Sequence, residues 1–302
     1  MPTDSRRIAG PESSTKPYTF CTEKSRHKLY FRYNLNDRCH FLRGNFQTFQ
    51  LDHTQPYFIT LKNGKRKDGR KENNIRPIFL KAGVVSQARG SAYIEQNETK
   101  VICAVYGPRE VVRKEDFSMK GQLTCEFRFA TFSCRERRQH QQDIEEKDYS
   151  VQLLEALEPA VRLDKFPKAQ VNIYVTVLQN DGSALAAAIT CASVALADSG
   201  IEMYDLVAGC AVRVAGKNLL MDPCNQEEYK PEDDSGLTNS GSVTVGLMPS
   251  LQQVSAITSK GEIEFELVKQ AVAKCVEICT QLYPVLQQAL VRSVSERQNE
   301  DG

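Results

Sequence analysis

The amino-acid sequence predicts an α+β fold in which mixed sheets pack against helices. Segments of alternating apolar and polar residues are grouped between residues 76 and 132, as expected for neighbouring strands joined by hairpins. A strand, a sharp turn, an Ala-rich helix and another strand follow between Gln170 and Cys210. A final segment of helical period runs from Glu264 to about Val294. We therefore expect one main domain over residues 65–294.

The stretch from Gln170 to Cys210 is the centre of this prediction. Its strand alternates apolar residues on one face, and the turn Asn180-Asp181-Gly182 ends it. We expect Gly182 to adopt a backbone angle that other residues avoid, and Asp181 or Ser183 to cap the following helix. That helix, Ala184 to Asp198, carries small residues on nearly every side and is expected to be mostly buried. Its N-terminus is a natural seat for an anion.

The elements before this stretch are four strands and a helix. The strands are expected in RPIFLKAGVVSQ, GSAYIEQ, TKVICAVYGP and GQLTCEFRFATF, with a turn at Gln96-Asn97-Glu98. After Ser133 a charged loop leads into a helix predicted from about Asp148 to Leu163. Apolar residues recur there every three or four positions and indicate one core-facing stripe. These residues are Val151, Leu154, Leu157 and Val161.

The elements after it are expected to be strands over Tyr204 to Ala215 and Asn218 to Met221, then a polar loop to Gly241. A further strand pair lies in SVTVGLMPSLQQVSAITSKGE, and the long last helix is expected to bend at Pro284. Residues 295–302 are predicted to be a disordered tail.

The first 64 residues form an N-terminal extension in this interpretation. Its segment 21–62 is aromatic and basic and has weak periodicity, and we interpret it as a segment appended to the main domain. Either it stacks on RNA bases or it is a poorly folded tail. The run Lys62 to Lys71, KNGKRKDGRK, also has two open interpretations: a nuclear signal or phosphate contact, or a solvated lead-in to the first strand.

Composition narrows the class of protein. The formal net charge is only +1, so a nucleic-acid surface must be local. The ten cysteines include no CxxC pair, and most lie in apolar segments, which indicates reduced thiols in a cytosolic or nuclear protein. The four histidines have no ligand-like spacing, so we expect no metal site and no cofactor. Neither a signal peptide nor a membrane span is expected.

Several spaced motifs resemble the RNase PH family. They are KDGR at Lys67 to Arg70, ARGSAYIEQNETKVICAVYGPRE, EALEPAV, ALADSGIEMYDLVAGCAV, LMDP and LMPSLQQV. More narrowly, the chain is similar to RNase PH-like ring subunits of the eukaryotic RNA exosome, of the Mtr type. The resemblance runs from about Lys65 to Arg292 and does not cover Cys21 to Lys62. It implies the RNase PH domain, a ribosomal protein S5 domain 2-like fold.

The resemblance also implies a reaction, phosphorolysis, in which phosphate attacks the last 3′ phosphodiester of RNA. Active members carry an arginine where this chain has Ala184, and a Ser-Arg pair where it has Asp143-Ile144. The first residue of the family's acidic pair matches Asp222, and the second falls on Glu228, where the family has aspartate. Such a pair could hold Mg²⁺, but Pro223 and an acidic loop follow Asp222. The arginine at position 184 and the Ser-Arg pair at 143–144 are the elements that bind phosphate in active members, and this chain lacks both. The bidentate contacts of guanidinium groups are hard to replace. We interpret these five positions as relict and the chain as not an enzyme.

A basic and aromatic cluster offers RNA contact without catalysis. Two interpretations stay open: the arginines contact phosphates along an RNA path, or the phenylalanines are core residues and the arginines pair with Glu136, Glu145 and Glu146. The cluster consists of Arg128, Arg135, Arg137 and Arg138, flanked by Phe127, Phe129 and Phe132.

The function implied by the resemblance is that of a non-catalytic structural subunit of the exosome core ring, which supports 3′-to-5′ RNA processing and degradation and lines the RNA path. Expected partners are other RNase PH-like subunits in a ring of six, S1 or KH domain cap proteins, and RNA, with no membrane. The expected location is the nucleus and nucleolus, and also the cytoplasm. One alternative is an active phosphorolytic 3′ exoribonuclease that uses Asp222 and Glu228. A weaker one is a free RNA-binding protein that acts through residues 21–62.

Overall fold

The computed structural model describes residue 66 and residues 68–111, 119–228 and 239–300. All of these belong to the second of two compact units, Gln55–Gly302. The predicted extension 1–64, with its segment 21–62, lies outside the described residues. Its boundary with the main domain stays a prediction.

The first sheet has five strands in the order β1-β2-β3-β5-β4. Only the β4–β5 pair is parallel. The predicted turn between β2 and β3 is confirmed, because Asn97 adopts a left-handed φ of 54° there. Alternate residues of β3 and β5 are almost fully buried, as expected for strands with one face on the core. The strands are Ile78–Ala82 (β1), Gly90–Gln96 (β2), Thr99–Glu110 (β3), Gln122–Phe129 (β4) and Ala169–Gln179 (β5).

The second sheet has four antiparallel strands in the order β7-β6-β8-β9. Strand β6 begins at Ala208, later than the predicted Tyr204, because the Tyr204 N–H bonds to the Ala160 carbonyl at 2.8 Å instead of joining the sheet. Strand β7 has the predicted bounds. The strands are Ala208–Ala215 (β6), Asn218–Met221 (β7), Ser240–Met248 (β8) and Gln253–Glu262 (β9).

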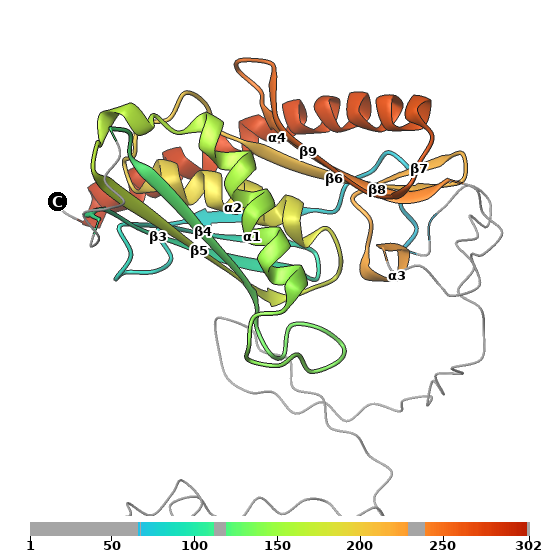
Figure 1. Ribbon diagram of the computed structural model, residues 1–302, viewed down its shortest axis with the longest axis horizontal. Coiled ribbons are helices and arrows are strands. Elements are labelled where there is room, and N and C mark those ends of the chain that lie inside the picture. Colours follow the sequence, from blue (N-terminus) through green and yellow to red (C-terminus); the bar gives the residue numbers. More distant parts are fainter. Residues whose placement is uncertain (1–65, 67, 112–118, 229–238, 301–302) are drawn as a thin grey trace, which may run out of the picture. The chain divides into compact units, whose positions relative to one another are not determined.

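Helix α2, Ala184–Asp198, has the bounds that the sequence predicts, and its residues from Ala184 to Leu196 are all buried. It packs against β2 and β3 of the first sheet and against β6 of the second (Figure 1). Alanine side chains let the backbones approach closely. A Cβ added to Gly209 on β6 would lie 2.4 Å from the Ala186 carbonyl oxygen. The small residues of α2 thus bring its N-terminus into contact with both sheets.

Helix α1, Ile144–Leu157, differs from its prediction. It begins earlier, because the Glu146 carboxylate accepts the Asp143 N–H at 3.1 Å and defines a first turn there. It ends earlier, because Pro159 belongs to a 3₁₀ turn, Glu158–Ala160. The predicted stripe is wrong at one position, because Val151 is 55% exposed and Leu153 faces the core instead, whereas Leu157 and Val161 are buried as predicted.

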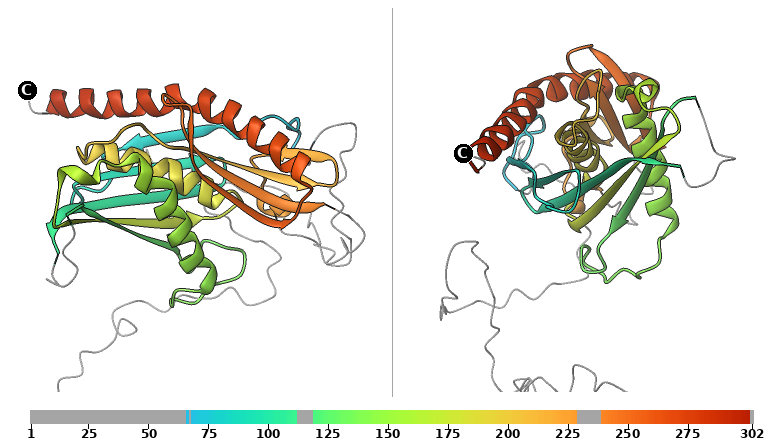
Figure 2. Two further views of the ribbon diagram at one scale, coloured as in Figure 1. Left: turned by 45° about the horizontal axis from the view of Figure 1, so that its top comes forward. Right: turned by 90° about the vertical axis from the view of Figure 1, so that its left-hand side faces the viewer.

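Helix α4, Phe265–Glu300, is longer than predicted and contains Pro284. It packs on β6 and β8, and Figure 2 shows its change of direction. The expectation of a disordered tail from residue 295 is wrong for residues 295–300. Arg297 donates a hydrogen bond to Asp198, whose side chain is 4% exposed at the end of α2. That ion pair ties the last turns of α4 to the core. The short helix α3 comprises Asn225–Glu228, and a second 3₁₀ turn spans Leu163–Lys165.

Candidate functional site at the first turn of the central helix

The turn that enters α2 has the geometry that the sequence predicts for Gly182, with φ of 88°. The Asn180 side-chain oxygen accepts the Gly182 N–H at 3.1 Å. The predicted cap is different, because the Ser183 side chain makes no capping bond and its hydroxyl donates to the Pro223 carbonyl at 3.0 Å. The first turn of α2 is therefore open to another acceptor.

That acceptor is Glu228. Its carboxylate accepts the Ser183 N–H at 3.1 Å, from the end of α3. Burial raises the pKa of Glu228 above its ordinary value, although the backbone bond from Ser183 lowers it in part. The positive end of a helix attracts an anion. Here the chain itself supplies that anion.

Glu228→Gln is expected to stabilise the protein increasingly as the pH rises from 4 to 7. A carboxyl whose folded-state pKa is raised costs stability once the unfolded chain ionises, above a pKa of about 4.3. The glutamine keeps an acceptor for Ser183 without that cost, so we expect a gain on the order of 1 kcal/mol at pH 7. Urea unfolding across this pH range checks the result.

Glu155→Gln makes the same chemical change at an exposed position of α1 and is the control. A Glu228→Gln difference that does not change with pH would contradict the assigned burial effect.

The carboxylate of Asp222, the other residue of the acidic pair, is bound by Arg76. The Arg76 guanidinium donates to both carboxylate oxygens, at 2.6 and 2.9 Å, and the Arg76 backbone N–H adds a bond at 2.9 Å. Burial alone would raise the pKa of Asp222, but the hydrogen bonds and charge of Arg76 hold it below the ordinary value. Asp222 and Glu228 therefore have separate partners.

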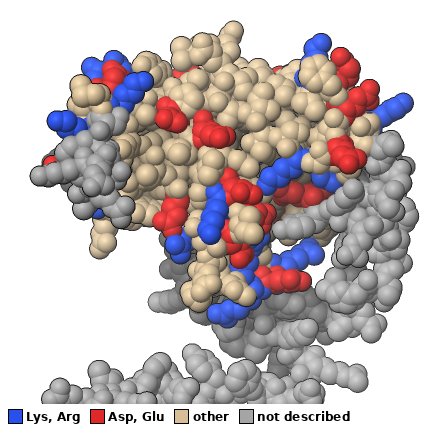
Figure 3. Space-filling view, viewed as in Figure 1, with Lys and Arg blue, Asp and Glu red and all other residues tan. Residues whose placement is uncertain are grey.

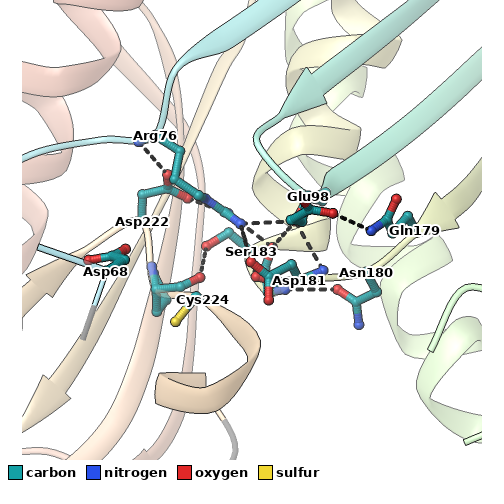
Figure 4. Close-up of polar contacts among 12 residues, drawn as sticks. Asp68, Arg76, Glu98, Gln179, Asn180, Asp181, Ser183, Asp222 and Cys224 are labelled. Atoms are coloured by element: carbon teal, nitrogen blue, oxygen red, sulfur yellow. Dashed lines mark hydrogen bonds and ion pairs between the residues drawn. The ribbon is translucent and has the colours of Figure 1, made fainter. Parts of the chain in front are cut away.

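Arg76 also binds the turn that precedes α2. It donates to the carbonyl oxygens of Asp181 and Gly182, at 2.9 and 3.1 Å, and to the Thr99 hydroxyl at 3.0 Å. Figure 4 shows Arg76 between Asp222 on one side and the Asp181–Ser183 turn on the other. One buried arginine thus joins the first strand region, the turn and the end of β7.

A second buried ion pair joins Arg66, in the basic run Lys62 to Lys71, to Glu227. Arg66 is 5% exposed and donates to Glu227 at 2.8 Å and to the Met221 carbonyl at 2.5 Å. Arg70 donates to the Asp222 carbonyl at 3.3 Å. Neither arginine was predicted to be structural. The described part of this run is thus more than a solvated lead-in, and a nuclear signal stays untested.

Glu228 and Ala184, but neither Asp143 nor Ile144, are among the residues that line a cleft of about 440 Å³. Ala184 lines this cleft, Asp143 is exposed at the start of α1, and Ile144 is 79% exposed. Two basic residues that sequence reasoning missed do line it, Arg213 and Lys260. Arg213 donates to the Ser240 hydroxyl at 2.9 Å, and Lys260 lies 4.2 Å from the Tyr149 ring centroid. A charged residue inside the apolar strand CAVRVA was the available signal for Arg213.

The four candidate RNA-binding arginines divide into two groups. Arg128 pairs with Glu126, and Arg138 donates to Glu145 at 2.9 Å while lying 4.1 Å from the centroid of the Phe129 ring. Arg135 and Arg137 are exposed. Figure 3 shows Lys and Arg interleaved with Asp and Glu on the visible face.

The phenylalanines divide in the same way. Phe127 and Phe129 are core residues, 0% and 6% exposed, as the second interpretation of the cluster holds. Phe132 is 73% exposed. Each interpretation therefore describes part of the cluster, and the exposed part is Phe132 with Arg135 and Arg137.

Two further observations concern the part of the chain that the structure describes. Its His, Cys, Asp and Glu side chains form no group of three or more that could hold a metal ion. None of its helices is long and apolar enough to span a membrane.

Comparisons with known proteins give the family. The model of the 3′ exoribonuclease family, domain 1, matches residues 74–202. The Homo sapiens protein named Exosome complex component MTR3 is 36% identical over 98% of each chain. Exosome complex component Rrp41 of Cenarchaeum symbiosum (strain A) is 36% identical over 76% of this chain and 91% of its own.

Solved structures agree on the fold. Rice Rrp46 aligns over 74% of this chain and 99% of its own, with a TM-score of 0.65 and 22% identity. A chain of the Archaeoglobus fulgidus exosome with RNA bound to the active site aligns over 74% and 92%, with a TM-score of 0.62 and 20% identity. The α+β RNase PH domain predicted from the sequence is confirmed. Sequence and fold together show that this chain belongs to the RNase PH family.

Proposed function

We propose that this chain is a structural, non-catalytic subunit of an exosome core ring that supports 3′-to-5′ RNA processing and degradation. Its similarity over nearly the full length to proteins named Exosome complex component MTR3 supports membership of that assembly. The relatives named Rrp41 match a smaller share of this chain.

The loss of phosphorolysis rests on one observation above all, the contact of the Glu228 carboxylate with the Ser183 N–H. Attacking phosphate needs donors that are not already used and a cation nearby. Ala184 offers no side-chain donor, and Asp143 brings negative charge at the start of α1. The cations that line the cleft, Arg213 and Lys260, already contact the Ser240 hydroxyl and the Tyr149 ring. An anion in this place would meet the chain's own carboxylate.

The contacts of Asp222 support the same conclusion. Both of its oxygens accept hydrogen bonds from Arg76, which is itself 3% exposed. A Mg²⁺ ion would have to displace this guanidinium from the carboxylate, at the cost of a buried unpaired arginine. A structural role for Asp222 is therefore favoured over a catalytic one.

The partners follow from the proposed assembly. The chain would pair with other RNase PH-like subunits in a ring of six, contact S1 or KH domain cap proteins, and line the RNA path with Arg135 and Arg137. Large apolar side chains on the surface, such as Ile144, Phe265 and Val291, would then lie in subunit interfaces. We place the assembly in the nucleus, the nucleolus and the cytoplasm.

The test is phosphate-dependent release of nucleoside diphosphate from a 3′-labelled oligoadenylate. The chain is co-expressed with its RNase PH-like partner, and the matching acidic residue of the partner is substituted. We expect no release above the control without phosphate, whether Glu228 is present or replaced by glutamine. Size-exclusion chromatography verifies that the pair is intact.

Release that requires phosphate and disappears in Glu228→Gln would instead support the active phosphorolytic exoribonuclease. Glu228→Gln is preferable to a change at Asp222, because the latter also removes the partner of Arg76.

A further inference from the structure

A second hollow, of about 580 Å³, lies beside the turn that enters α2. Its walls come from the loop after β4, the end of β5 and the β2–β3 turn. The volume falls within the range of small-ligand sites, about 300–1,000 Å³. We propose that this hollow receives one nucleobase of single-stranded RNA, stacked on Phe132. The inference rests on the proposed RNA path and specifies where that path contacts a base.

The first observation is the exposure of Phe132. Its neighbours Phe127 and Phe129 on β4 are buried, whereas Phe132 follows the strand, is 73% exposed and lines the hollow. An exposed aromatic ring costs solubility without contributing to the core. Every nucleobase has a π-face, so such a ring is a platform for a base of any sequence.

The second observation is the distribution of charge around the hollow. Arg135 is exposed, and Lys100 is partly exposed on the neighbouring wall. These cations would contact the phosphates on either side of the bound base. The carboxylates of Glu98 and Asp181 also line the hollow and disfavour a phosphate inside it. The charges thus place the backbone outside and the base inside.

The third observation concerns the edge of the base. Glu98 and Asp181 offer acceptor oxygens, although Glu98 already has one partner and Asp181 has two, Arg76 and the Asn225 N–H. Gln179 donates to Glu98 at 2.6 Å, and Arg76 lies 3.6 Å from Asp181. Acceptors pair with exocyclic amino groups, as carboxylates do with the N4 amino group of cytosine. We therefore infer a preference for cytosine over uracil.

The experiment uses the full chain in complex with its RNase PH-like partner. Fluorescence anisotropy measures the affinity for labelled oligo(C), oligo(U) and an abasic strand of the same length. Phe132→Leu keeps an apolar side chain but removes the π-face. Phe79→Leu makes the same change at another exposed phenylalanine, on β1, 56% exposed, and is the matched control.

We expect Phe132→Leu to weaken oligo(C) binding about tenfold and abasic binding less than twofold, since stacking on one base accounts for a factor of that size. Phe79→Leu should change neither, and unaltered complex should bind oligo(C) more tightly than oligo(U). Arg135→Ala should weaken all three strands alike, because it removes a phosphate contact.

Four results would overturn the inference. Equal loss for oligo(C) and the abasic strand would show that Phe132 does not stack on a base. Unchanged oligo(C) affinity in Phe132→Leu would reject the site while leaving the RNA path of Arg135 and Arg137 intact. Loss of the subunit pair in size-exclusion chromatography would assign Phe132 to a protein contact. Absence of RNA binding by the unaltered complex would reject both this inference and the proposed RNA path.

Discussion

Arg76→Ala is expected to lower the free energy of unfolding by about 3–5 kcal/mol, the usual cost of leaving one member of a buried ion pair without its partner. Asp222 would keep a nearly buried carboxylate and lose both guanidinium bonds. The Thr99 hydroxyl and the carbonyls of Asp181 and Gly182 would lose a donor as well. Urea unfolding followed by circular dichroism measures the loss.

The effect should depend on pH in a defined direction. Because Arg76 holds the pKa of Asp222 below its ordinary value, the pair stabilises the protein above a pH of about 3.9. That stability is lost as the pH falls through the lowered folded-state pKa. The difference between the unaltered protein and Arg76→Ala should therefore shrink toward acid pH.

Two variants separate this charge effect from a general loss of packing. Adding Asp222→Asn to Arg76→Ala should recover part of the stability, because a neutral amide replaces a buried charge whose remaining cation, Arg70, lies 3.6 Å away. Arg128→Ala removes an exposed ion pair with Glu126 and should cost less than about 1 kcal/mol. If Arg76→Ala cost no more than Arg128→Ala, the structural role of Asp222 would be refuted.

Gly209→Ala should cost about 3 kcal/mol, at the upper end of typical overpacking effects. Its new Cβ would lie 2.4 Å from the Ala186 carbonyl oxygen and 3.1 Å from the Ala186 Cα. These are backbone atoms, so no side chain can rotate away, and α2 must move off β6. Thermal unfolding shows the effect as a lowered Tm.

Gly200→Ala separates steric overlap from backbone strain. Gly200 has a φ of 75° and no atom within 4 Å of its added Cβ, so only the left-handed conformation is penalised, by about 1–2 kcal/mol. Equal destabilisation by the two substitutions would argue against the close approach of α2 and β6. The close packing of α2 against β6 also positions the first turn of α2 near Glu228.

The segments with the strongest local patterns were predicted well. Helix α2 has its predicted bounds, Ala184–Asp198, because a glycine turn precedes it and its Ala-rich run needs burial on nearly every side. Helix α1 was predicted poorly. Its start depends on the bond between Glu146 and the Asp143 N–H, whereas the prediction followed a stripe of apolar residues that includes exposed Val151.

In the candidate site too, residue identities could be predicted from the sequence and contacts could not. The sequence by itself determined the family resemblance and the lack of arginine at Ala184 and Ile144, because both depend on residue identity at a position. Only the tertiary structure decided what Asp222 and Glu228 contact. Arg76 is 146 positions from Asp222, and Ser183 is 45 from Glu228. Contacts across such separations follow from the packing of α2 between two sheets, and no local pattern of charge or hydrophobicity encodes them.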